Sequence, residues 1–157
     1  MGNAFSKYEI IRITPTLNNG VAYAAGDVAF VATEIPNAVL GKGGCSKIIN
    51  CFVVDQDRDT YDLSIFFSEG NTALGTINAT ANISDADFEA IGFNGGFTFQ
   101  SDQAATGHID QVRIMKSQSF SLTGESVEPM LIQAAAGSTS VYVQGIIVDG
   151  TPTFAAA

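Results

Sequence analysis

The stretch that decides the fold is residues 47–67, KIINCFVVDQDRDTYDLSIFF. Residues 47–55 form a nearly continuous run of β-branched and aromatic side chains, and residues 60–67 form a second run. Only a short polar connection separates them, and two strands joined in this way are the sequence form of a β-hairpin. We therefore predict a hairpin over residues 49–67, with one strand over 47–55 and the next over 60–67.

Further strands are predicted on both sides of this hairpin. Alternating or continuous apolar runs place them at residues 8–13, 27–33, 107–116, 119–123, 129–134 and 139–148. Both faces of residues 139–148 are largely apolar, which indicates a central strand or one buried at a subunit contact. Turn signals such as Gly95-Gly96 lie between the runs. The pattern predicts an all-β fold, either an antiparallel β-sandwich or a barrel-like fold.

One segment departs from the strand pattern and predicts a short helix near residues 84–91. Ser84 is placed to accept a hydrogen bond from the backbone of Asp87, and Asp85 and Asp87 suit the positive end of the helix dipole. Gly92 is placed to end the helix. A helix of about two turns is not stable alone, so it must dock on a sheet.

The length of 157 residues predicts a single β domain over residues 1–157. Residues 1–6 and 151–157 are predicted to be flexible arms. The chain is 46% hydrophobic but only 15% charged, against about 25% charged for an ordinary soluble domain. That balance suits a protein whose surface is partly covered by neighbours in an assembly.

The charge balance disfavours two classes of partner. Seven Lys and Arg against sixteen Asp and Glu leave a net charge of −9, which repels both phosphate backbones and anionic lipid headgroups. No apolar run reaches the roughly 20 residues that span a bilayer. Residues 1–6 match the N-myristoylation pattern, but the acidic chain supplies no basic patch as a second anchor. We expect no nucleic-acid partner and no membrane partner.

Residues that could support catalysis are few. His108, the only histidine, lies two residues before Asp110 in a predicted strand, and no nucleophile motif accompanies it. A polar side chain on the solvent face of a sheet is the favoured interpretation. Cys45 and Cys51 match no zinc spacing. We interpret Cys51 as a buried thiol and expect no disulfide. We expect no enzyme activity, no catalytic residues and no cofactor.

Asp55, Asp57 and Asp59 form a D-x-D-x-D pattern, which is how Ca²⁺ gathers oxygen ligands in a loop. The EF-hand pattern fails, because Thr60 stands where a glycine is needed and Phe66 where a glutamate is needed. The three aspartates remain the candidate metal ligands. The alternative is a solvated turn, in which Asp is common, and under that interpretation the chain binds no metal.

Residues 23–28 (YAAGDV) and 34–39 (EIPNAV) resemble the opening of a group of small virion structural proteins of tailed bacteriophages. Residues 49–67, 83–86 and 141–154 are similar to later parts of that group. The resemblance implies a head decoration or cement protein on the exterior of the capsid, a homotrimer whose partner is the major capsid protein. It transfers no functional residue.

We therefore expect a non-enzymatic virion structural protein that stabilises contacts between major capsid subunits. Two alternatives stay open at this point. One is a structural protein of the phage neck or tail. The other is a carbohydrate- or calcium-binding β-sandwich module.

Overall fold

The computed structural model describes residues 9–103, 112–116, 118–119 and 129–155. Its one α-helix in that part of the chain is α1 (Asp85–Ala90), and Ser101–Gln103 form a 3-10 turn. The strands are β1 (Val28–Ile35), β2 (Cys45–Ile48), β3 (Phe52–Asp55), β4 (Tyr61–Ser68), β5 (Phe93–Phe99), β6 (Arg113–Lys116), β7 (Gln118–Ser119), β8 (Met130–Gln133) and β9 (Val141–Gly150). Every strand pair is antiparallel, which confirms the predicted all-β fold with one short helix.

Most of the core lies on one face of a five-stranded sheet of order β1-β9-β4-β5-β7. Alternate residues of its strands point into the core, as period-2 geometry requires. These inward residues include Leu63, Ile65, Phe67, Phe97, Phe99, Val141, Val143 and Ile147. Strand β9 lies between β1 and β4, so the predicted central strand near the C-terminus is confirmed.

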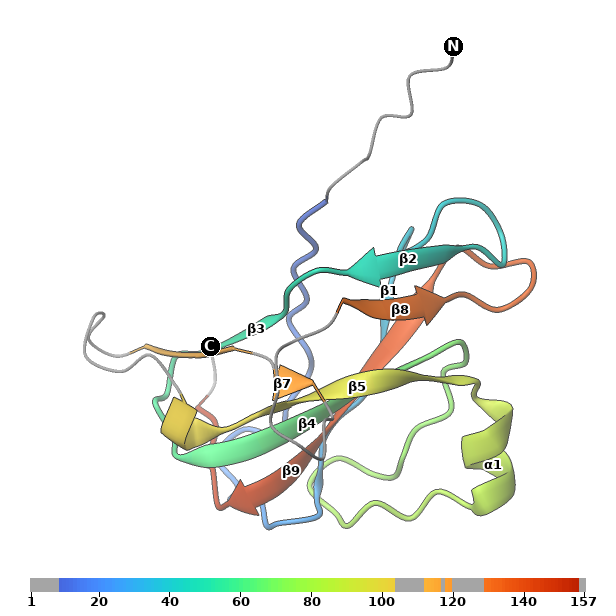
Figure 1. Cartoon of the computed structure of the whole chain (residues 1–157). Helices are drawn as coiled ribbons and strands as arrows, with labels where there is room; N and C mark the ends of the chain where they lie inside the picture. The colour runs from blue at the N-terminus through green and yellow to red at the C-terminus, as the bar shows by residue number, and fades with distance from the viewer. Residues whose placement is uncertain (1–8, 104–111, 117, 120–128, 156–157) are drawn as a thin grey trace.

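The strands form one long antiparallel ribbon that is rolled up. Along the chain, β1 pairs with β9, β2 with β8, β3 with β6 and β4 with β5, as in a single extended hairpin. The ribbon closes on itself because β4 also pairs with β9. The two short pairs, β2–β8 and β3–β6, form an outer layer whose inward residues Ile132 and Met115 are buried in the core (Figure 1). The choice between a sandwich and a barrel-like fold stays a prediction.

The predicted hairpin over residues 49–67 is wrong. Strands β3 and β4 are consecutive, but β3 pairs with β6 in the outer layer, whereas β4 pairs with β5 and β9 in the main sheet. Residues 56–60 are therefore a corner between layers. The strand predicted over 47–55 is also divided, because the chain changes partner from β8 to β6 at residues 49–51.

Strand β5 was not predicted, because Gly95-Gly96 suggested a turn. In the structure both glycines lie inside the strand, and a Cβ on Gly95 would stand 2.8 Å from the sulfur of Met130. The first glycine thus makes room for a core side chain. A glycine that permits close packing inside a strand cannot be distinguished, in the sequence alone, from a glycine that marks a turn.

The strand predicted over residues 8–13 is wrong for residues 9–13, which have no regular secondary structure. Ile13 and Leu17 instead pack against the core from an extended segment, while Ile10 and Ile11 are exposed. The alternating pattern is typical of a strand, but residues 9–13 belong to none of the sheets in the described part of the chain.

The short helix has the predicted ends. The Ser84 hydroxyl accepts a hydrogen bond from the backbone N–H of Asp87 at 3.1 Å, and Gly92 has a φ of +62°. The ring of Phe88 lies 5.5 Å from that of Phe93, so the helix docks on the start of β5. Within the described residues, the strands predicted over 27–33, 60–67, 113–116 and 129–134 are confirmed. Residues 107–111 and 120–123 lie outside that part.

Candidate interaction surface

The three aspartates of the D-x-D-x-D pattern lie at the corner between β3 and β4. Asp55 is buried, and one of its carboxylate oxygens accepts a hydrogen bond from the backbone N–H of Asp57 at 2.9 Å. The carboxylate of Asp57 accepts from the backbone N–H of Ala155 at 2.9 Å, and that of Asp59 from Thr153 at 2.6 Å. The pattern therefore binds the C-terminal segment of its own chain.

The C-terminal segment packs into the core over residues 151–155, so it is not the flexible arm predicted for this region. Phe154 is only 5% exposed. Its ring meets those of Tyr23 and Tyr61 edge-on at centroid distances of 5.3 and 5.4 Å. Residues 156–157 and the predicted arm at 1–6 lie outside the described residues.

Burial raises the pKa values of two groups at this corner, Asp55 and Tyr61. Desolvation raises the pKa of the Asp55 carboxyl, and this outweighs the lowering by the hydrogen bond from Asp57. The charges of Asp59 and Asp57 raise it further. Burial likewise raises the pKa of Tyr61, and the nearby Asp55 adds to this effect. Burial thus favours the neutral forms of Asp55 and Tyr61.

The described residues offer little to a metal ion. No three His, Cys, Asp or Glu side chains gather there in a way that could hold one. Asp57 and Asp59 each use a carboxylate oxygen on the backbone of the C-terminal segment, as described above. The proposed calcium ligands thus lie close together, and the structure gives two of them a different role.

Cys45 is exposed and Cys51 is half-buried, and both thiols are free. Burial raises the pKa of Cys51 to about 11, so this thiol is neutral at physiological pH. His108 and Asp110 lie outside the described residues. Cys51 is therefore not an activated nucleophile.

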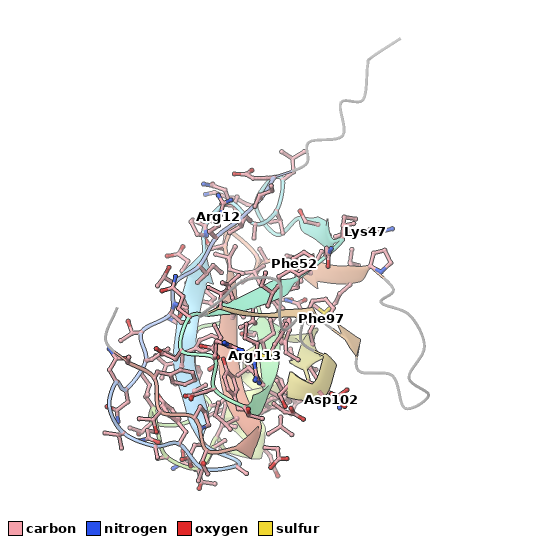
Figure 2. All side chains as sticks on the ribbon, turned by 90° about the vertical axis from the view of Figure 1, so that its left-hand side faces the viewer. Arg12, Lys47, Phe52, Phe97, Asp102 and Arg113 are labelled. Atoms are coloured by element: carbon pink, nitrogen blue, oxygen red, sulfur yellow. The ribbon has the colours of Figure 1, made fainter. Side chains whose placement is uncertain are left out.

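The most distinctive surface feature is a set of exposed apolar side chains on the outer layer, which we call the apolar face. Its members are Ile49, Phe52, Val54 and Leu131. Phe52 is 55% and Val54 59% exposed, whereas Val53 between them packs against the core. The alternation shows that one side of β3 covers the core while the other presents apolar groups to solvent. Figure 2 shows Phe52 and Lys47 on this layer.

A second exposed apolar feature is residues 10–12, which we call the N-terminal arm. Ile10 is 82% exposed and Ile11 is also exposed. Arg12 lies on the opposite side of the upper end of the molecule from Lys47 in Figure 2. Just after the arm, Ile13 packs against the core and anchors the segment.

The apolar face was missed in the sequence because residues 48–54 are apolar apart from Asn50. Such a run is typical of a strand buried on both faces. The run therefore indicated a covered outer face, but it could not show that the side chains of Phe52 and Val54 stay more than half exposed.

Comparisons with protein-family models, with curated proteins and with solved structures found no match. Among the described residues, no helix is long and apolar enough to cross a membrane.

Proposed function

We propose that this chain is a non-enzymatic structural protein of a tailed-phage virion. It decorates the outside of the head and acts as a cement protein that bridges major capsid subunits. The observation that carries the proposal is the apolar face. Apolar side chains gathered on a rigid β-layer mark protein interaction sites when nothing in the chain covers them.

Two further features support this proposal. The rolled antiparallel ribbon is the kind of connectivity found in jelly rolls, an architecture that viral capsid proteins use, and this support is by analogy of fold alone. The net charge of −9 disfavours packaged nucleic acid as the partner and is compatible with the exterior of the shell. A protein that contacts several coat subunits at once gains affinity through multivalency.

The test is binding to heads of the encoding phage that lack this protein. Purified protein is mixed with such heads and sedimented, and the bound amount is measured against total protein. We expect saturable binding with hundreds of copies per head. Deleting residues 1–6 is expected to weaken this binding and leave the fold intact. Protein that stays in the supernatant at all concentrations would contradict the proposal.

Copy number separates the head from the neck and tail. Quantitative mass spectrometry of purified virions is expected to give hundreds of copies for a decoration protein. A value of roughly a dozen would instead match the ring symmetry of a neck or tail component. That outcome would move the protein to a different part of the virion.

A further inference from the structure

Charged residues divide unevenly between the two layers of the molecule. Within the described strands, the main sheet has no Lys or Arg, and its acidic residues are Glu34, Asp62 and Asp149. The described strands of the outer layer have one acidic residue, Asp55, which is buried. Their basic residues are Lys47, Arg113 and Lys116. In its strands the outer layer is therefore basic, although the whole chain has a net charge of −9.

Lys47 lies directly beside the apolar face. It is the register partner of Leu131 in the β2–β8 ladder, and both side chains are exposed. Opposed residues of antiparallel strands point to the same side, with Cβ atoms about 5 Å apart. Lys42, in the loop before β2, is also exposed. Asp57 and Asp59 lie past the far end of β3, where their carboxylates accept from the C-terminal segment. The apolar face thus carries positive charge at its β2–β8 end.

The combination of apolar and basic side chains selects a class of partner. Charges at the rim of an interface are matched by opposite charges on the partner, which speeds association and fixes the register. Nucleic acid and anionic lipid spread negative charge over a large surface, so the net charge of −9 opposes both. A confined acidic patch on a protein interacts mainly with charges within a Debye length, about 8 Å at physiological salt. An acidic protein surface is therefore the partner that fits.

We propose that the apolar face and its lysines dock on an apolar patch of the major coat protein that is bordered by Asp and Glu side chains. This inference rests on the proposed function and adds the chemistry of the partner. Phe52 supplies the buried contact, because exposed aromatic side chains become the strongest anchors of an interface when a partner covers them. Lys47 pairs with a carboxylate at the rim, so it controls the association rate and the salt dependence.

The charge is tested by sedimentation with heads that lack this protein, at low and at high salt. Lys47→Glu should bind about 10-fold more weakly at low salt and lose part of the salt dependence. Lys47→Arg keeps the charge and should bind like the wild type. The matched control is Arg12→Glu, which changes the net charge equally at an exposed site across the molecule from Lys47 (Figure 2). This control should bind within about twofold of the wild type.

The apolar contact and the partner carboxylates have separate tests. Phe52→Ala should weaken head binding at least about 10-fold, while circular dichroism shows an intact fold. A carbodiimide joins a lysine amine directly to a carboxylate that touches it. On decorated heads it should couple Lys42 or Lys47 to an Asp or Glu of the coat protein, which peptide mass spectrometry identifies. Coupling to the coat protein through other lysines alone would overturn the inference.

The outcomes separate this inference from the proposed function. If the wild type binds heads and Lys47→Glu binds as well as Arg12→Glu does, the acidic partner patch is wrong and head decoration stands. If the wild type does not bind heads at all, both fail. Sedimentation of the wild type with vesicles of anionic phospholipid, or with duplex DNA, should show no binding. Binding to either that Lys47→Glu abolishes would assign the face to that partner and overturn the inference.

Discussion

Replacing Phe154 with alanine is expected to destabilise the whole domain, although this residue lies only three positions from the C-terminus. Its ring is 5% exposed and contacts Tyr23 and Tyr61 edge-on. Truncating a buried Phe to Ala costs about 3–5 kcal/mol. Each aromatic pair accounts for about 0.5–1.5 kcal/mol of that loss. For a domain of this size the Tm should fall by about 6–20 °C.

The assay is urea unfolding followed by circular dichroism, since the chain has no tryptophan. Phe52→Ala is the matched control, because this ring is more than half exposed. Its substitution should change the free energy of unfolding by no more than about 0.5 kcal/mol. If Phe154→Ala behaves like this control, the C-terminal segment contributes nothing to the core. The reasoning from burial would then be refuted, and the flexible arm predicted from the sequence would be right.

Three further predictions concern single side chains, two of them buried and one half-buried. Because the pKa of Asp55 is raised in the folded state, its contribution to stability is full below its ordinary pKa of 3.8 and is lost as the pH rises through the folded-state pKa. The free energy of unfolding measured from pH 3 to 8 should show this loss in the wild type and not in Asp55→Asn. Parallel pH profiles for the two proteins would count against this prediction. With a pKa of about 11, only about one Cys51 thiol in a thousand is a thiolate at pH 8. In the wild type a thiol reagent should therefore label the exposed Cys45 rapidly, whereas in Cys45→Ser the remaining Cys51 should be labelled only on unfolding. Rapid labelling of Cys45→Ser would show that Cys51 is accessible. The buried side-chain amide of Gln144 accepts a hydrogen bond from the backbone N–H of Leu74 and donates one to the backbone carbonyl of Thr72, both at 3.0 Å. Gln144→Leu should therefore cost about 2–4 kcal/mol in urea unfolding and speed hydrogen exchange at Leu74, and unchanged exchange would contradict this role.

Local sequence patterns predicted element types well and strand partners poorly. The run over residues 60–67 and the apolar run near the C-terminus are strands, as their composition indicates. The capping pattern at Ser84 specified the helix because its hydrogen bonds join residues three apart. By contrast, β3 and β4 are neighbours in sequence but belong to different sheets, since each finds its partner far along the chain.

The candidate site shows the same division. The D-x-D-x-D pattern correctly marked carboxylates that accept from a specific partner, but the sequence suggested that this partner was a metal ion. The structure assigns Asp59 to Thr153 and Asp57 to Ala155, which are 94 and 98 positions away. A carboxylate in a loop satisfies a cation and a backbone N–H equally well as an acceptor, so the local pattern cannot distinguish them.

The sequence by itself determined the all-β class, the short helix and the acidic surface, because these depend on local periodicity, capping and composition. Only the tertiary structure decided that the ribbon rolls up, that Phe154 enters the core, and that Phe52 and Val54 face solvent. These outcomes depend on which distant surfaces meet. Strand pairing and burial are settled by the free energy of the whole packed chain, and no short stretch of residues contains that information.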